Sequence, residues 1–289
     1  MPLVTLNQLR NSGEKRRGVG LFNVAGLEFA EAILAAAEEL DTPVILGLPE
    51  RFFQFYDLEN VVHLCVDLAR RAKVPTVVHI DHGKSFDCVV KALRHGVSSV
   101  MFDGSTLSYE ENVLQTAEIV RIAHTMGVSV EGELGYVGRG DDFNPEDASN
   151  YTEPAQAADF VKRTGVDALA VAVGTAHGIY KAPPKLDFQR LQAIRKAVEV
   201  LLVLHGGSGL SELDFQRAIA CGIDKVNIFT ELSLSTMRNV AEAIPKCPGW
   251  IEVTAEMHRT IKSTVRHYMT VFNTPLPERQ NHDSLQSPA

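Results

Sequence analysis

Short apolar segments alternate with longer amphipathic segments along most of this chain. The short segments are rich in β-branched residues and nearly continuous in apolar character, which is typical of parallel strands covered on both faces. They lie at 18–25, 43–48, 75–81, 98–104, 129–135, 168–174, 201–207 and 225–230. Segments with helical periodicity separate them, at 28–40, 57–72, 85–95, 108–126, 154–164, 187–199 and 211–221.

The unbroken series of strand–helix units predicts the fold class. Asp57, Ser85 and Ser211 can each cap a following helix, and Pro154 suits a first helical turn. Eight units without a linker favour one α/β domain, a closed (β/α)8 TIM barrel with a C-terminal helical extension, over an open doubly wound sheet. We expect this domain to span 1–273 and the polar, proline-containing tail 274–289 to be disordered.

Two polar segments, 136–152 and 175–186, follow the fifth and sixth predicted strands. Loops of this length in a compact domain are often lids or binding loops. We therefore expect both to border a functional site.

Charge and cysteine usage exclude several classes of partner. The formal net charge is −8, and no stripe of Lys and Arg is present, which argues against nucleic acid and anionic membranes as partners. The cysteines are widely spaced and form no CxxC pair, as in reduced proteins: Cys65, Cys88, Cys221 and Cys247. The N-terminus lacks a signal-peptide pattern, and no apolar run approaches the roughly 20 residues that span a bilayer. We expect a cytoplasmic protein.

Three histidines end apolar segments and precede small residues. His82, His177 and His205 are associated with the third, sixth and seventh predicted strands. A single buried histidine is more often a hydrogen-bonded core residue than a ligand, but three imidazoles at one end of a barrel can hold a catalytic zinc ion with an open fourth position. Asp81, next to His82, is then a candidate acid–base residue.

Further polar residues end other predicted strands, and the carboxyl ends of barrel strands carry the chemistry in this fold class. These residues are Asn23, Asp103, Glu133, Asn227 and Thr230. Asp103 could instead cap the next helix. Glu131 and Glu133 share a strand face, so either could orient a ligand histidine or bind a second metal, and His79 is a candidate supporting residue.

The turn Gly206-Gly207-Ser208-Gly209 leads directly into a predicted helix. Backbone amides at a helix N-terminus bind phosphate, and glycine allows its close approach. A phosphate shared by the loops after strands seven and eight is usual in barrels, although the glycines could serve turn geometry alone.

At these residues the chain resembles the class II, zinc-dependent ketose-bisphosphate aldolases, nearest the tagatose-bisphosphate aldolase branch. The resemblance extends over roughly 18–240 and rests on several short motifs. They are His79-Ile80-Asp81-His82, Asp103-Gly104-Ser105, Glu131-Gly132-Glu133-Leu134-Gly135, Gly174-Thr175-Ala176-His177-Gly178, Leu204-His205-Gly206-Gly207-Ser208-Gly209-Leu210 and Lys225-Val226-Asn227-Ile228.

The resemblance implies reversible retro-aldol cleavage of a ketose 1-phosphate or 1,6-bisphosphate to dihydroxyacetone phosphate and an aldehyde. His82, His177 and His205 would hold Zn²⁺, and Glu133 and Asp103 a second or displaced metal. Asp81 would be the acid–base residue, Asn227 would stabilise the developing charge, and Asp141 or Asp142 would be the lid acid. The substrate-binding residues would be Asn23, Gly178, Gly206, Gly207, Ser208, Asn227 and Thr230. Gly178 and Ser208 could also bind a monovalent cation, Na⁺ or K⁺.

The chain departs from the family pattern where the aldehyde half would bind. Trp250-Ile251 stands where relatives have an arginine that binds the distal phosphate, with Arg259 or Arg266 as possible replacements. Gly47-Leu48-Pro49 replaces a serine or threonine after the second strand. An acceptor aldehyde without a phosphate is therefore an alternative substrate.

Three other functions remain open from the sequence. A Schiff-base aldolase would need an inward lysine, and Lys225 and Lys181 are both poorly placed for this role. A zinc hydrolase could use the same histidines. A catalytically weak sugar-phosphate-binding subunit is the non-enzyme alternative. We expect a small sugar phosphate as ligand and a homodimer or homotetramer.

Overall fold

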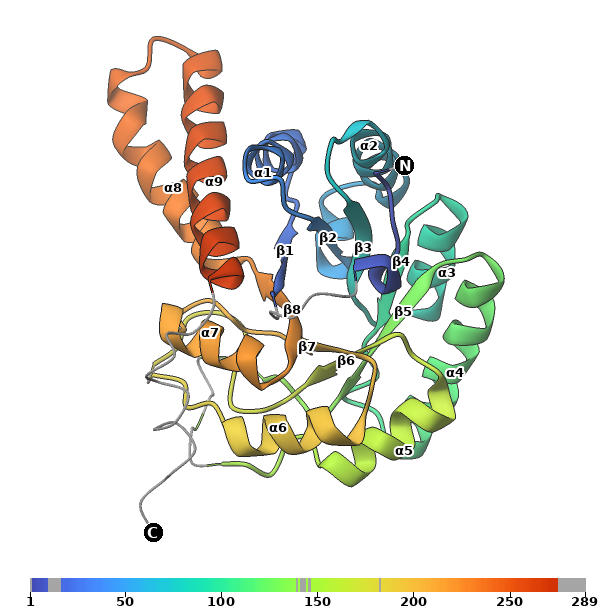
Figure 1. Ribbon diagram of the computed structural model, residues 1–289. Helices are drawn as coiled ribbons and strands as arrows, with labels where there is room; N and C mark the ends of the chain where they lie inside the picture. Colours follow the sequence, from blue (N-terminus) through green and yellow to red (C-terminus); the bar gives the residue numbers. More distant parts are fainter. Residues whose placement is uncertain are drawn as a thin grey trace.

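The computed structural model describes residues 2–9, 17–138, 140, 144, 147–181 and 183–274. Its strands are all parallel, pair in sequence order and close into a barrel, with β8 beside β1 (Figure 1). The strands are β1 (Val19–Asn23), β2 (Val44–Pro49), β3 (Thr76–Gly83), β4 (Ser99–Phe102), β5 (Ser129–Leu134), β6 (Ala168–Val171), β7 (Leu201–Leu204) and β8 (Ile223–Ile228). The prediction of a (β/α)8 TIM barrel is confirmed.

A helix follows each strand and covers the outside of the barrel. The helices are α1 (Leu27–Glu39), α2 (Leu58–Arg71), α3 (Phe86–Arg94), α4 (Tyr109–Thr125), α5 (Pro154–Thr164), α6 (Phe188–Ala197), α7 (Glu212–Cys221), α8 (Thr230–Ala243) and α9 (Trp250–Asn273). The predicted caps are confirmed: Asp57, Ser85 and Ser211 each accept a hydrogen bond from a backbone amide in the first turn, and Pro154 begins α5.

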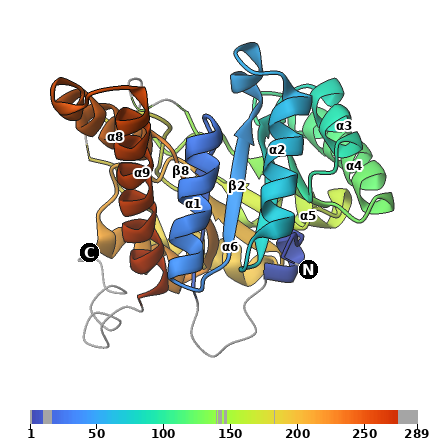
Figure 2. The ribbon, with the colours of Figure 1, turned by 90° about the horizontal axis from the view of Figure 1, so that it is seen from above.

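The C-terminal extension is a pair of helices that projects beyond the barrel (Figure 1). The short 3-10 helix η3 (Ile244–Lys246) lies between α8 and α9, and α9 packs against α1 and α8, as the view from above also shows (Figure 2). The predicted disordered tail lies outside the described residues from 275 onward. Across the described part of the chain, no helix combines the length and apolar character needed to cross a bilayer.

Several strands are shorter than the apolar pattern predicted. The sixth was expected at 168–174 and the seventh at 201–207, whereas β6 ends at Val171 and β7 at Leu204. Ala172 and Val173 are apolar and buried, so they continue the hydrophobic pattern of β6. They lie beyond Val171, the last residue of β6 that pairs with β5, and are not part of the sheet. Burial and strand pairing therefore end at different residues here.

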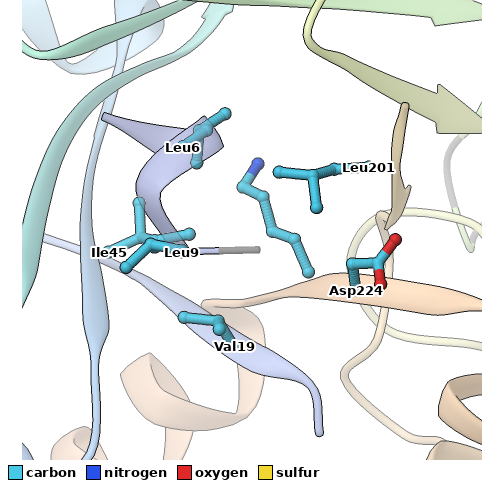
Figure 3. Close-up of a pocket in the computed structure, with 7 residues that line it drawn as sticks. Leu6, Leu9, Val19, Ile45, Leu201 and Asp224 are labelled. Carbon is cyan, nitrogen blue, oxygen red and sulfur yellow. The ribbon is translucent and has the colours of Figure 1, made fainter. Parts of the chain in front are cut away.

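The barrel interior is closed at the amino ends of the strands by the 3-10 helix η1 (Leu6–Leu9). Leu6 is buried with the inward-facing residues Val19, Ile45 and Leu201 in an apolar cluster separate from the one between strands and helices. A small pocket remains between η1 and the strands, and the residues that line it include Lys225 (Figure 3). The interior next to this apolar plug therefore contains a charged side chain.

The charge of Lys225 is neutralised inside the barrel by Glu131 of β5. The Lys225 Nζ donates to Glu131 Oε2 at 2.7 Å, and both side chains are at most 2% exposed. Removing one partner of a buried ion pair leaves the other charge without compensation, which is costly in a medium of low dielectric constant.

We predict that Lys225→Met lowers the free energy of unfolding of the metal-free protein by about 3–5 kcal/mol, measured by urea denaturation. The double variant Lys225→Met/Glu131→Gln should recover most of this loss, because no uncompensated charge remains. Arg71→Met is the matched control, since its pair with Asp67 is about two-thirds exposed and should contribute less than about 1 kcal/mol. Equal losses in Lys225→Met and Arg71→Met would contradict the importance of the buried pair.

Candidate active site

The carboxyl end of β3 places two neighbouring polar residues on the same side of the strand. In a regular strand Asp81 and His82 would point to opposite faces. The pairing of β3 with β4 is irregular between Ile80 and Gly83, and His82 has a φ of 49°, a left-handed conformation that is uncommon outside glycine. Such a bulge redirects a side chain next to an active site. Both side chains consequently reach the mouth of the barrel.

Three imidazole rings meet at this mouth. His82 Nε2 lies 3.1 Å from His177 Nε2 and 2.9 Å from His205 Nδ1. The rings stand nearly perpendicular to one another, with interplanar angles of 78° and 76° between His82 and its two neighbours. One nitrogen from each ring therefore faces a common point, and the three nitrogens lie within 4.8 Å of one another.

His205 follows β7 directly, but His177 is not at the end of β6 as predicted. It lies in the following loop and is held by backbone pairing with the loop after β5. The His177 amide donates to the Gly138 carbonyl at 2.8 Å, and the Gly140 amide donates to the His177 carbonyl at 2.7 Å. The two long loops predicted to border the site thus meet at His177.

Each ring is oriented through its other nitrogen. His82 Nδ1 lies 2.9 Å from Asp103 Oδ2, and His205 Nε2 lies 3.0 Å from Glu131 Oε1. His177 Nδ1 lies 3.1 Å from the Val137 carbonyl oxygen, so it donates a proton there. Such partners set the tautomer and orientation of metal-binding imidazoles. The arrangement directs the three remaining nitrogens toward the common point, where each can donate an electron pair to a metal once it is deprotonated.

Asp81 is held between two amide side chains. Its Oδ2 accepts a hydrogen bond from Asn23 Nδ2 at 2.8 Å, and its Oδ1 accepts one from Asn227 Nδ2 at 3.0 Å. All three residues are buried, on β1, β3 and β8. The carboxylate is therefore fixed in orientation beside the imidazole cluster.

The electrostatics of the cluster keep Asp81 ionised. Burial alone would raise the pKa of Asp81, but the nearby positive charges of His82 and Lys225 and the bond from Asn23 bring it to about 2. Burial opposes protonation of His82, yet the charge of Asp81 and the bond to Asp103 raise its pKa to about 9. Burial and the charge of His82 lower the pKa of His177 to about 4, and the pKa of His205 is also lowered, mainly by burial. Two of the three rings are thus neutral near pH 7.

A second group of possible metal ligands adjoins the first. His82, Asp103 and Glu133 each offer an atom within 4.8 Å of the others. Glu133 Oε2 is buried without a hydrogen-bond partner and lies 3.9 Å from His82 Nδ1. Burial and the charge of Asp103 raise the pKa of Glu133 to about 8. A cation bound here would stabilise the charged form of Glu133, whose buried oxygen has no other partner.

The glycine turn after β7 lies against the start of α8. Ser208 Oγ accepts a hydrogen bond from the Glu231 amide at 3.1 Å, and Thr230 is the first residue of α8. Gly206 has a φ of 66°, which suits glycine, and its carbonyl accepts a bond from the Tyr180 hydroxyl at 2.7 Å. Gly207 packs close to Ile228 and Phe215, where a side chain would be crowded. Gly178, with a φ of 92°, follows His177 in the neighbouring loop.

Some predicted residues are not brought to the site. Asp141 and Asp142 lie outside the described residues. Arg266 pairs with Glu39 at the C-terminal end of α1, which is the barrel end remote from the mouth, so it does not replace the distal arginine. Arg259 pairs with Glu256 on the outer helix α9. Trp250 and Ile251 are both more than 70% exposed on the projecting helical pair.

Sequence reasoning left the choice between Glu131 and Glu133 open and treated Lys225 only as a poor nucleophile. In the structure Glu131 contacts the ligand-like His205, accepts from Lys225, and lies 3.7 Å from His79 Nε2. The sequence signal that could have identified Glu131 is its position on the same face of β5 as Glu133, which alternation along the strand predicts. No sequence pattern pairs it with Lys225, because 94 residues separate them.

Comparison with known proteins agrees with this geometry. The family model described as class-II fructose-bisphosphate aldolase matches residues 4–275. The fructose-bisphosphate aldolase of Geobacillus stearothermophilus is 39% identical over 281 residues, covering 95% of this chain and 98% of that protein. The crystal structure of the YdjI aldolase from Escherichia coli K12 superposes with a TM-score of 0.85 at 36% identity, covering 93% of this chain and 97% of the other.

A further relative, the fructose-bisphosphate aldolase of Staphylococcus aureus (strain Mu50), is 40% identical over 250 residues, which are 84% of this chain and 87% of that protein. The match of the family model over nearly the whole barrel, together with these relatives, settles the family. The chain belongs to the class II fructose-bisphosphate aldolase family, and it is an aldolase-type enzyme on a TIM barrel.

Proposed function

We propose that this protein is a zinc-dependent aldolase that reversibly cleaves a ketose 1-phosphate or 1,6-bisphosphate to dihydroxyacetone phosphate and an aldehyde. The observation that carries the proposal is the meeting of three imidazole nitrogens beside a fixed carboxylate, Asp81. Membership of the class II family supports it. The substrate series includes tagatose and fructose phosphates, and ketose 1-phosphates whose aldehyde half is not phosphorylated.

The donor set fits Zn²⁺. Nitrogen ligands lie about 2.0–2.1 Å from zinc, so two ligands of a tetrahedral ion are separated by about 3.3 Å. The separations of 2.9 and 3.1 Å from His82 Nε2 to the two other nitrogens are close to that value. Neutral imidazoles at His177 and His205 supply electron pairs. Asp103 orients the ring of His82 and Glu131 that of His205, as carboxylates do for histidine ligands at zinc sites. Three protein ligands leave a position for substrate.

Bound at this position, Zn²⁺ would supply a Lewis acid that polarises the ketose carbonyl. Asp81, ionised and aligned by Asn23 and Asn227, accepts the proton of the C4 hydroxyl as the C3–C4 bond breaks. Asn227 has a second amide hydrogen for the oxygen on which negative charge develops. Asp141 or Asp142, in the loop after β5, delivers the proton to C3 of the departing half.

The phosphate of the dihydroxyacetone phosphate half binds at the loops after β6, β7 and β8. Gly206, Gly207 and Ser208 provide backbone close to the N-terminus of α8, where Thr230 adds a hydroxyl, and Gly178 provides backbone from the loop after β6. This binding positions C3 and C4 for the reaction. Na⁺ or K⁺ at Gly178 and Ser208 would neutralise part of the phosphate charge. We further propose a homodimer or homotetramer located in the cytoplasm.

The structure disfavours a Schiff-base mechanism at Lys225, one of the two lysines that the sequence offers for it. Lys225 is 2% exposed and its amine is bound to Glu131 in the barrel interior, so it does not reach a carbonyl at the mouth. A zinc hydrolase would not need the glycine turn at the start of α8. Product analysis separates the hydrolase from the aldolase.

We predict that the zinc-loaded protein releases dihydroxyacetone phosphate from at least one ketose 1-phosphate or 1,6-bisphosphate, detected by coupled reduction. Zinc removal with EDTA should abolish release, and borohydride should not trap the substrate.

Asp81→Asn should retain zinc but lower kcat by about 10²–10⁴-fold, because the general base is lost while the ligands remain. Near-normal turnover of Asp81→Asn would remove Asp81 from this role.

We predict that Asp103→Asn weakens zinc binding by about 10–100-fold, measured by competition with a chelating dye. The substitution keeps an acceptor for the Ser105 hydroxyl and amide but removes the carboxylate that accepts from His82. Asp67→Asn, in an exposed helical pair, is the control and should leave zinc affinity unchanged. Unchanged affinity in Asp103→Asn would show that Asp103 does not support the metal ligand.

A further inference from the structure

Arg51 lies at the rim of the active site, in the 3-10 helix η2 (Glu50–Gln54) that follows β2. The last residue of β2, Pro49, pairs in register with Asp81 of β3. Arg51 is two residues further along and exposed. Arg51 therefore lies just beyond the carboxyl end of β2, the strand that pairs with the one carrying Asp81, the proposed general base.

Aromatic rings hold the guanidinium on the side of β8. The Arg51 Cζ lies 5.3 Å from the centroid of the Phe52 ring and 5.7 Å from that of Phe229, and the two rings contact each other edge to face at 5.2 Å. Phe229 stands between Asn227, which binds Asp81, and Thr230. Stacking of this kind orients the planar group and leaves its N–H donors free to bind an anion in two-pronged fashion.

The segment that carries Arg51 is tied to the loops on both sides. Glu50 accepts hydrogen bonds from the Ser85 hydroxyl at 2.6 Å and the Ser85 amide at 3.1 Å, after β3. The Tyr56 hydroxyl donates to the Ala25 carbonyl at 2.6 Å, after β1. The segment that carries Arg51 is thus fixed between the loops after β1 and β3, near Asn23 and Asp81, while the guanidinium lies over Phe229 at the start of α8.

Among the described residues, no carboxylate forms an ion pair with Arg51, whereas Arg259 and Arg266 are both paired on α9. The proposed mechanism places the C4 hydroxyl, and hence the aldehyde half, at Asp81. A stacked arginine without a carboxylate partner is suited to a phosphate or carboxylate group.

We propose that Arg51 forms an anion subsite for the far end of the aldehyde half, which takes a phosphate or carboxylate group. This inference rests on the proposed aldolase function. It makes Arg51 a specificity-determining residue that replaces the missing C-terminal arginine.

The test compares aldol addition of dihydroxyacetone phosphate to aldehydes ending in phosphate, carboxylate or a neutral hydroxymethyl group. Arg51→Gln should lower kcat/KM for the preferred anionic aldehyde by about 10–100-fold, mainly through KM, because a charge-assisted bond is lost. The value for the neutral aldehyde should not change, and Arg51→Lys should be intermediate. Lys84→Gln is the control: it removes a cation from the neighbouring loop and should change kcat/KM little for either kind of aldehyde.

Direct binding separates this inference from the proposed function. Calorimetric titration of the zinc-loaded protein with inorganic phosphate and with glycolate should show one anion-binding event, separate from those at the glycine turn and at zinc, that is lost in Arg51→Gln and kept in Lys84→Gln. Loss of this event with phosphate identifies a phosphate subsite, and its loss with glycolate a carboxylate subsite. Identical titrations of the wild type and Arg51→Gln would overturn the proposal, as would equal losses for neutral and anionic aldehydes. Failure to release dihydroxyacetone phosphate would overturn only the proposed function.

An independent observation concerns the outer surface of the barrel. Glu59 and His63, one turn apart on α2, face His95 at the end of α3. His63 Nε2 lies 3.2 Å from His95 Nδ1, and Glu59 Oε1 lies 3.7 Å from the same atom. The separation of 3.2 Å is close to the roughly 3.3 Å between neighbouring ligands of tetrahedral zinc, and the three possible ligand atoms all lie within 4.8 Å of one another.

We infer that Glu59, His63 and His95 form a second zinc site that links α2 to α3. Both helices belong to the outer layer of the barrel, so this site lies on the outer surface and not among the polar residues at the mouth. A metal there binds the folded chain only and stabilises it without entering the reaction.

Metal analysis after zinc loading should give one zinc fewer per chain in His95→Ala than in the wild type. Zinc should raise the unfolding temperature of His95→Ala less than that of the wild type, with turnover unchanged. His267→Ala, which removes a histidine beside the single carboxylate Glu212, is the matched control. Equal zinc content in the wild type and His95→Ala would overturn the site.

Discussion

The site depends on the left-handed backbone of His82 at the end of β3. Regular alternation would send Asp81 into the barrel mouth and His82 into the layer of helices, or the reverse. The bulge places both at the mouth, where His82 meets His177 and His205. A φ of 49° is unfavourable for histidine, so the surrounding bonds, above all from Asp103, must stabilise it. The backbone of one residue thus joins a base and a metal ligand.

The interior of the barrel supports this arrangement with charges. Glu131 connects His205 at the mouth to Lys225 deeper in the barrel, and Ser99 Oγ holds His79 at 2.7 Å beside them. These groups are buried, so each needs a partner. The apolar cluster of Leu6 with inward-facing residues of the strands closes the opposite end of the barrel. Fold stability and ring orientation are coupled through the same network.

The sequence was sufficient to predict the barrel and most of the site. Continuous β-branched runs located every strand, because parallel strands are buried on both faces, and residues after these runs had to gather at one barrel end. The eighth strand was expected at 225–230 but is Ile223–Ile228; the polar Asp224 hid its first residues, and Asp224 lies where the pairing with β7 is irregular. The bulge at His82, the Glu131–Lys225 pair and the stacking of Arg51 on Phe229 depend on contacts between distant segments, which local pattern does not encode. The two candidate lid acids lie outside the described residues and stay predictions.

X-ray absorption spectroscopy at the zinc edge tests the central claim most directly, on protein loaded with one equivalent of zinc and on His63→Ala to remove the outer cluster. The account predicts three imidazole nitrogens at about 2.0–2.1 Å and one further light ligand, unchanged in His63→Ala. The imidazole signal should fall by one ring in His205→Ala. A shell composed mainly of carboxylate oxygens, or one insensitive to His205→Ala, would contradict a metal held by His82, His177 and His205.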